Sequence, residues 1–171
     1  MSAPETLEWW ADGERLFGTA LGRLTDEEFD VPSLLPGWDR RHVLAHVARN
    51  ADALVNLLTW ARTGVEMPMY ASAEARAAGI AEAAALDAPK LRGEVLAATV
   101  RLADAVHGMS EEAWSAQVRT AQGRAVPAAE VPWMRCREVY VHAVDLDAGV
   151  GFAERLQQGG MARARPRRAA A

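Results

Sequence analysis

Glu138 and His142 are the residues whose types and spacing best fit a chemical site in this sequence. They stand four positions apart, so on a helix they lie one turn above each other and can aim at one point. A carboxylate and an imidazole are both zinc ligands, and a zinc centre that does chemistry usually has three protein ligands and one open position. The pair therefore predicts two of the three protein ligands of a metal site.

His46 is the best candidate for the third ligand. The same spacing of glutamate and histidine also occurs on exposed helices, where the two form only a weak surface pair. Both segments are apolar here, however, and a buried carboxylate is costly unless it is paired or ligates a metal. The flanking apolar residues are Val43, Leu44, Val47 and Leu54 around the histidine, and Val139, Val141, Val144 and Leu146 around the pair.

His42 leaves a second arrangement open. It precedes His46 by four residues, so these two rings could chelate a metal together. His42 falls in the first turn of its helix beside Arg40 and Arg41, where the positive end of the helix dipole disfavours a cation. We therefore rank His42 second and expect the site to be built from two distant helices.

The length and composition fit one globular domain. The chain has 171 residues, of which 50% are hydrophobic, enough for a substantial core. No apolar run approaches the roughly 20 residues of a membrane span, and the N-terminus has no basic region followed by an apolar one, so we expect a cytoplasmic protein. The single cysteine, Cys136, fits a reducing compartment and points about 200° round the helix from Glu138, which favours a packing role.

Charge is distributed unevenly along the sequence. The last 17 residues hold five arginines and no acid, whereas residues 1–154 hold 14 basic and 23 acidic groups, a net charge of −9. An acidic body argues against nucleic-acid binding. Arginines scattered among Ala, Gly and Pro are typical of a disordered end, although an arm that touches a nucleic acid or a membrane would have the same composition.

The periodicity predicts an all-α protein in which long helices position the candidate ligands. A loop at residues 64–70 could form a pocket wall, and Gly123 marks a turn in a minor hairpin or irregular segment. Four long helices with long connections favour a bundle that builds its metal site from facing helices. The expected long helices span residues 5–23, 40–62, 88–107 and 130–149, with shorter helical pieces at 72–86 and 110–114.

Two stretches carry a family resemblance, LLPGWDRRHVLAHVARNADALVNLLTWARTGVEMPMY and AQGRAVPAAEVPWMRCREVYVHAVDL. They resemble the N-terminal domain of mycothiol-dependent maleylpyruvate isomerases, within the DinB-like family of metal-binding four-helix bundles. The similarity covers roughly residues 1–152. It implies a divalent metal, usually zinc, on the residues that correspond to His46, Glu138 and His142. It also implies that Arg76 and Asp145 lie near the thiol cofactor and the substrate.

The resemblance implies a reaction in aromatic catabolism. Mycothiol, held as a thiolate by the metal, would add to maleylpyruvate and leave again after bond rotation, giving fumarylpyruvate. No catalytic group beyond the thiolate is identified, and the partners are a small-molecule substrate and a low-molecular-weight thiol. A mycothiol-dependent S-transferase and a non-catalytic metal-binding bundle stay open as alternatives, as does the oligomeric state.

The chain departs from the family pattern after Phe152. Full-length members continue into a C-terminal α/β domain that contributes an arginine to the active site, whereas this sequence continues as GGMARARPRRAAA. We expect residues 153–171 to be a basic, disordered tail, and the chain to be a truncated or frame-shifted member whose activity the missing domain would limit.

Overall fold

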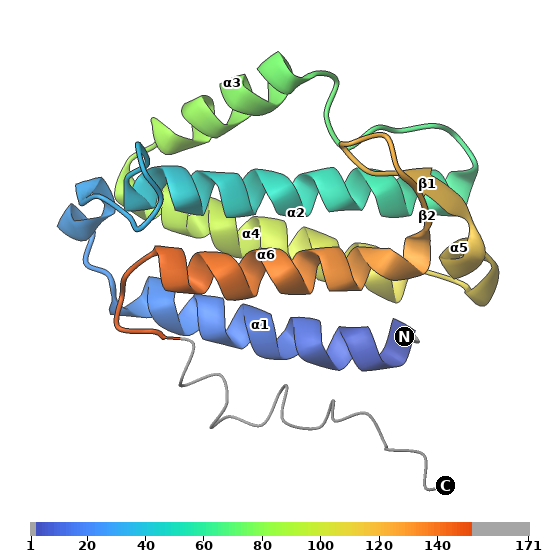
Figure 1. The fold of residues 1–171 in the computed structure, drawn as a ribbon, viewed down its shortest axis with the longest axis horizontal. Helices are drawn as coiled ribbons and strands as arrows, with labels where there is room; N and C mark the ends of the chain where they lie inside the picture. The colour runs from blue at the N-terminus through green and yellow to red at the C-terminus, as the bar shows by residue number, and fades with distance from the viewer. Residues whose placement is uncertain (1–2, 152–171) are drawn as a thin grey trace, which may run out of the picture.

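The computed structural model describes residues 3–151, and four long helices form its body (Figure 1). They are α1 (Ala3–Arg23), α2 (Arg40–Thr63), α4 (Ala88–His107) and α6 (Val131–Asp145). Helix α1 packs along α6, α2 packs along α4, and contacts between α2 and α6 join the two pairs. The predicted all-α bundle is confirmed, and each predicted long helix is present.

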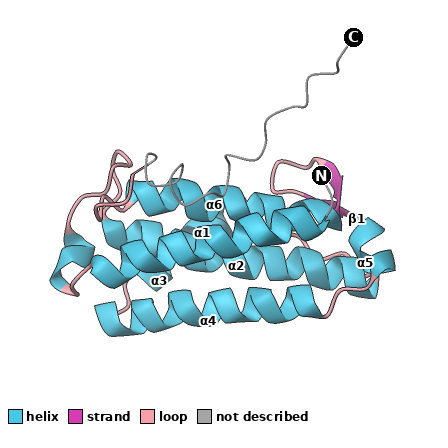
Figure 2. Ribbon diagram, turned by 90° about the horizontal axis from the view of Figure 1, so that it is seen from below, coloured by secondary structure: helices cyan, strands magenta, loops and turns pink. Residues whose placement is uncertain are grey.

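Shorter elements fill the connections between the long helices (Figure 2). Helix α3 (Ala73–Ala84) lies against α2, and the short helices are η1 (Glu27–Asp30), α5 (Glu111–Ser115) and η2 (Ala128–Glu130). Strands β1 (Gln117–Arg119) and β2 (Ala125–Pro127) pair antiparallel, with Val118 opposite Val126. The predicted minor hairpin is therefore confirmed, and both central valines face the core.

Side-chain caps explain where the helices begin. The carboxylate of Asp39 accepts a hydrogen bond from the backbone N–H of His42 at the start of α2, and Asp87 does the same for Lys90 at the start of α4. Each cap satisfies a backbone donor that the first turn leaves free. Gly64 ends α2 with a φ of 71°, in the left-handed region that glycine adopts without a steric penalty.

The predicted end of α6 was wrong. The sequence favoured a helix that runs to Gly149, but α6 ends at Asp145. The guanidinium of Arg40, at the start of α2, donates to the backbone carbonyls of Leu146 and Asp147 at 2.7 and 2.8 Å. Because a side chain from a distant element takes these carbonyls, the chain leaves the helix early, and Asp147 adopts a φ of 49°.

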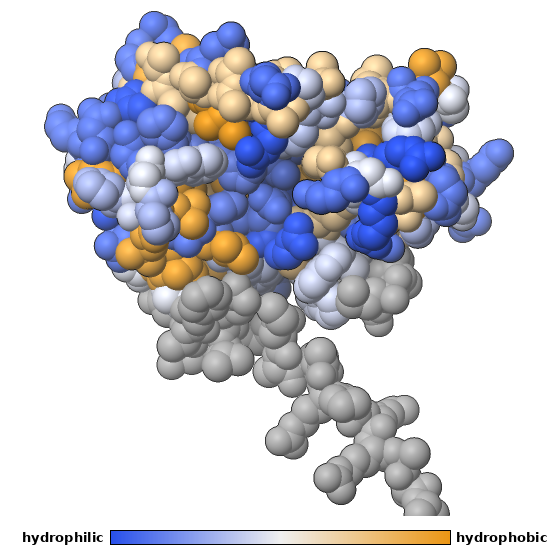
Figure 3. Space-filling view, turned by 45° about the horizontal axis from the view of Figure 1, so that its top comes forward, coloured by the Kyte–Doolittle hydropathy of each residue, from blue (hydrophilic) through white to orange (hydrophobic). Residues whose placement is uncertain are grey.

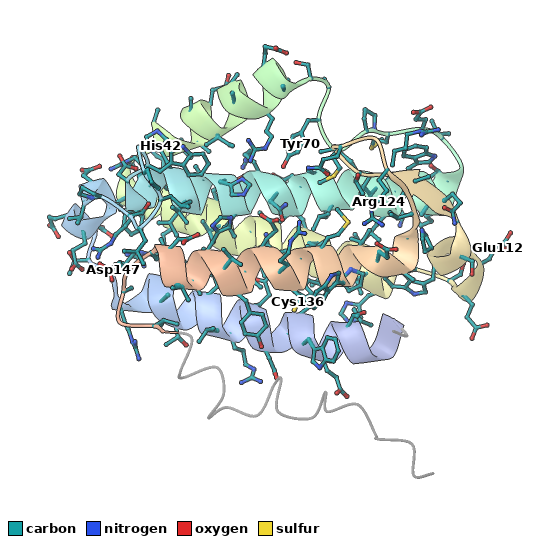
Figure 4. The ribbon with its side chains drawn as sticks, viewed as in Figure 1. His42, Tyr70, Glu112, Arg124, Cys136 and Asp147 are labelled. Atoms are coloured by element: carbon teal, nitrogen blue, oxygen red, sulfur yellow. The ribbon has the colours of Figure 1, made fainter. Side chains whose placement is uncertain are left out.

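The core is largely apolar, and Arg135, which is 1% exposed, is the most deeply buried of its charged residues among those the structure describes. Its Nε donates to Glu14 of α1 at 2.7 Å, and its Nη1 donates to the Val47 carbonyl and to Asn50 of α2 at 2.7 and 3.2 Å. One guanidinium therefore links α1, α2 and α6. Cys136, on the side of α6 that faces α1, is buried as expected (Figure 4).

Helices α1 and α6 pack closely against each other at Gly13. A Cβ atom there would lie 2.6 Å from the Cγ2 of Val139, so only glycine fits without a shift. Among the residues that the structure describes, no helix is both long and apolar enough to cross a lipid bilayer. The expected basic tail, residues 153–171, lies outside the described residues.

Candidate metal centre

Helices α2 and α6 bring His46, Glu138 and His142 together, and their ligand atoms all lie within 4.8 Å of one another. The Oε2 of Glu138 lies 3.1 Å from Nε2 of His46 and 3.4 Å from Nε2 of His142. The two imidazole rings stand nearly perpendicular, with centroids 4.9 Å apart. Side chains 92 and 96 positions apart in sequence thus point at one spot.

This cluster is largely shielded from solvent, and its charge state suits metal binding. His46 is 6% exposed, and burial lowers its pKa below the ordinary 6.5. Burial alone would raise the pKa of Glu138, but hydrogen bonds from His142 and His46 outweigh it and hold that pKa well below its usual range. At neutral pH the carboxylate is ionised and the His46 ring carries no extra proton, as metal ligands require.

The chemistry of the donor set fits zinc. Two imidazole nitrogens and one carboxylate oxygen are the ligands of many catalytic zinc sites, in which the fourth position stays open to water or substrate. A small cavity of about 120 Å³ adjoins His46 and Glu138, so an open position would face accessible space. We call this space the inner cavity.

The outer nitrogens of both histidines are also engaged. Nδ1 of His142 lies 2.8 Å from Oδ2 of Asp145, and Nδ1 of His46 lies 3.3 Å from Nη2 of Arg76. A carboxylate behind a histidine commonly fixes the orientation of that ring at metal sites. Asp145 therefore stands directly behind His142 and does not line the inner cavity, whereas Arg76 does.

The competing candidate His42 is held elsewhere. Its Nδ1 lies 2.6 Å from Oδ1 of Asp39, and its side chain is 40% exposed. Figure 4 shows it at the N-terminal end of α2, and the group of converging ligand atoms does not include it. The centroid of the Trp38 ring lies 5.7 Å from that of His46 and 6.1 Å from that of His42.

Asn50 is a candidate functional residue that sequence reasoning missed. It is 6% exposed and lines the inner cavity one helical turn after His46. A guanidinium can only donate, so the Asn50 atom that faces Arg135 must be its oxygen. The Asn50 amide nitrogen is therefore the group that can donate a hydrogen bond to a ligand in the cavity. The four-residue spacing from His46 was the available signal.

Tyr70 and Arg76 form the far side of the inner cavity. The Arg76 guanidinium lies over the Tyr70 ring, 5.7 Å from its centroid. Burial raises the pKa of Tyr70, so its hydroxyl stays protonated at neutral pH and can donate a hydrogen bond. Figure 4 shows Tyr70 between α3 and α2.

A larger space, the outer cavity, adjoins the inner one. Its volume is about 510 Å³, and the predicted pocket-wall loop contributes Glu66, Pro68, Met69 and Tyr70 to its lining. The remaining walls come from α2, the start of α3 and the turn of the β1–β2 hairpin. On the face of the molecule that Figure 3 shows, hydrophilic residues gather toward the middle.

Comparisons with known proteins agree on one family. A family model described as the mycothiol maleylpyruvate isomerase N-terminal domain matches residues 3–147. The crystal structure of a mycothiol-dependent maleylpyruvate isomerase is 46% identical, with a TM-score of 0.88 over 90% of this chain. A histidine-to-alanine mutant of that enzyme is 45% identical with the same TM-score and coverage. The chain spans 64% of the length of both structures, and no curated protein matches it.

Proposed function

The chain belongs to the family of mycothiol maleylpyruvate isomerase N-terminal domains, and we propose that it binds zinc and isomerises maleylpyruvate to fumarylpyruvate with mycothiol. The observation that carries this proposal is the convergence of His46, Glu138 and His142 beside an accessible cavity. A single buried cysteine is consistent with the reducing cytoplasm, where a thiol cofactor stays reduced.

The reaction needs a thiolate that adds and then leaves. Zinc on these ligands would supply a positive charge that keeps a thiol deprotonated near neutral pH. The sulfur bonds to one carbon of the cis double bond, and the electron pair moves to the oxygen of the conjugated ketone. The remaining single bond rotates, the electron pair returns, and the carbon–sulfur bond breaks to leave the trans isomer. No atom is gained or lost.

Asn50 is well placed to stabilise the charge that this addition creates. Asn50 lines the inner cavity, and its oxygen accepts a hydrogen bond from Arg135, which leaves the amide N–H available to a ligand. A fixed donor aimed at a developing oxyanion lowers the barrier without reorganisation. We assign Asn50 the role of donating a hydrogen bond to the ketone oxygen.

Arg76 is the group that we expect to bind a substrate carboxylate. In the structure it contacts Nδ1 of His46. A neutral imidazole that binds a metal through Nε2 carries its proton on Nδ1, so Arg76 loses that acceptor and is free to pair with a carboxylate. The family resemblance also puts Asp145 near the thiol, and we propose that it acts there by orienting His142.

Metal analysis combined with a product assay tests this function. We expect about one zinc per chain, lost in the His46→Ala variant, and thiol-dependent conversion of maleylpyruvate to fumarylpyruvate followed by NMR. A product that retains the thiol would indicate S-transfer instead of isomerisation, because the two reactions differ only in whether the thiol adduct breaks down again. Zinc binding without any thiol-dependent turnover would leave a non-catalytic metal-binding bundle and overturn the proposal.

A further inference from the structure

The inner cavity lies between two walls that each contribute an arginine. Among the residues that the structure describes, its lining contains two cationic side chains, Arg76 from α3 and Arg137 from α6. Helices α3 and α6 lie on opposite sides of α2, which contributes His46 and Asn50 to the same lining (Figure 1). The two guanidiniums therefore approach the cavity from different elements, and one ligand can contact both.

Arg137 adjoins the candidate metal ligands through Glu138. Its Nη2 lies 3.6 Å from Oε1 of Glu138, whereas the other oxygen, Oε2, faces Nε2 of His46 and of His142. A separation of 3.6 Å is too long for a hydrogen bond, so this pair is held by charge alone. The Arg137 side chain is also 64% exposed. An exposed ion pair of this kind costs little to break, so the guanidinium can turn to another anion.

The position of Arg137 on α6 places its cation at the mouth of the inner cavity. Consecutive residues of an α-helix project about 100° apart, so Arg137 leaves the helix beside the face that carries Glu138. Met134, three residues earlier, lines the cavity as well, so the two side chains form one wall. The apolar stem of an arginine can pack along such a wall while its charged end stays in water.

Maleylpyruvate carries a carboxylate at each end of its carbon chain, and both must be accommodated when it binds. The cavity already contains the Glu138 carboxylate, so two more negative charges would enter a space that holds one. Like charges at close range repel each other, and an unpaired carboxylate is costly to remove from water. Arg76 can pair with one of the two substrate carboxylates, and the second needs another cation. Arg137 is the remaining cation of the described lining.

We propose that Arg137 binds the second carboxylate of the substrate and makes the site selective for acids with a carboxylate at both ends. Arg76 binds one end and Arg137 the other, and the conjugated ketone lies between them, where Asn50 of α2 donates to its oxygen. The planar guanidinium fork can form two parallel hydrogen bonds with a carboxylate. This inference rests on the proposed function, since it takes maleylpyruvate as the substrate.

Calorimetric titration of the zinc-loaded 171-residue protein with three acids tests the proposal. Fumarylpyruvate is the diacid, and crotonylpyruvate and fumarylacetone each have a methyl group in place of one of its two carboxylates. No thiol is added, so binding is measured without turnover. We expect the diacid to bind at least about tenfold more tightly than either monoacid, because each monoacid leaves one guanidinium unpaired. Equal affinity of the wild type for the three acids would overturn the inference.

Arg137→Gln should weaken the binding of fumarylpyruvate and of one monoacid by at least about tenfold, and leave the other monoacid and the zinc content unchanged. The matched control is Arg124→Gln, because Arg124 is 62% exposed, pairs with Glu130 and lines neither cavity, so its loss should change none of these values. Equal losses for both monoacids in Arg137→Gln would mean that Arg137 acts through Glu138 and not on a carboxylate. That result, or an unchanged affinity for fumarylpyruvate, would overturn the inference.

Steady-state kinetics separate this inference from the proposed function. Thiol-dependent turnover in the wild type, with an unchanged KM for maleylpyruvate in Arg137→Gln, would support the isomerase and sink the inference. Selective loss of carboxylate binding in a protein that does not turn over maleylpyruvate would support the inference and sink the isomerase. If fumarylpyruvate does not bind the wild type and no turnover is seen, both proposals fall.

Discussion

Two side chains at the candidate metal centre depend on a neighbour that orients them. Asp145 contacts His142, and Arg135 holds the amide of the adjacent Asn50. Such partners determine whether a ligand atom points at the metal or away from it, and they affect metal affinity although they do not touch the metal. The chemistry proposed here therefore depends on pairs of residues rather than on single ones.

Removal of any one ligand should cost most of the metal affinity. We expect His46→Ala, Glu138→Ala and His142→Ala each to lower zinc affinity by about 100-fold or more, because two remaining ligands rarely hold zinc in a protein. Competition with a chromophoric chelator measures the effect. The control is His42→Ala, whose ring contacts Asp39 outside the cluster and should leave the affinity unchanged. A comparable loss in that variant would mean that the ligand set is misassigned.

Asn50→Asp tests the donor without disturbing the packing. Aspartate has the same shape and keeps an oxygen for Arg135, but it has no N–H to offer the substrate. We expect kcat to fall by about 100-fold at unchanged zinc content, the usual cost of losing one oxyanion donor. Steady-state kinetics on the zinc-loaded variant gives the answer, and an unchanged kcat would remove Asn50 from the mechanism.

Zinc binding should weaken on the acid side of neutrality. Protons compete with the metal for its ligands. The lowered pKa of His46, due to burial, and the low pKa of Glu138, which its hydrogen bonds maintain despite burial, keep both groups in their binding form at pH 7. Affinity should stay level from pH 8 to about 6.5 and fall below that as histidine protonation begins. Chelator titrations at a series of pH values should show this, whereas a steep fall between pH 8 and 7 would contradict it.

The spacing of Glu138 and His142 revealed the candidate pair in the sequence, because helix geometry alone puts both on one face. The same rule relates Asn50 to His46, yet the role of Asn50 could not be predicted. Its orientation depends on Arg135, which lies 85 positions away. Local spacing tells which residues share a helix face, but which atom points at a site depends on packing.

At the scale of elements, local chemistry predicted where helices begin better than where they end. Asp39 and Asp87 cap their helices through backbone groups a few residues away, so the sequence contains the whole interaction. The end of α6 depends instead on Arg40, more than 100 positions earlier. No local pattern contains that contact, which is why the helix was predicted too long.

The close approach of α1 and α6 gives a test at this scale. Gly13→Ala should lower the free energy of unfolding by about 1–3 kcal/mol, because the new methyl group would clash with Val139. A methyl group at Gly18, on the same helix, would meet no packed neighbour within 4 Å, so Gly18→Ala should raise stability by about 0.5–1 kcal/mol. Urea denaturation of both variants compares them, and a stabilising Gly13→Ala would show that the helices can separate freely there.

At the scale of the whole molecule, the buried side chain of Arg135 links helix α6 to α1 and α2 through hydrogen bonds. Removing one partner of a buried ionic group leaves the other uncompensated. Arg135→Met should therefore lower the free energy of unfolding by about 3–5 kcal/mol, since Glu14 would lose its cationic partner and the Val47 carbonyl and Asn50 would lose a buried donor. The matched control is Arg124→Met, which breaks an exposed pair with Glu130 and should cost less than about 1 kcal/mol. Similar losses in both would mean that the buried network contributes little.

The candidate ligands and the walls of the outer cavity come from two different kinds of element. The three candidate ligands project from α2 and α6, whereas most of the outer cavity is built from the 64–72 loop, the start of α3 and the hairpin turn. Connections tolerate insertions and exchanges far better than packed helices do. Evolution, or an engineer, could therefore replace the hairpin and the loop to change the ligand of the outer cavity while α2 and α6 keep the same three candidate ligands.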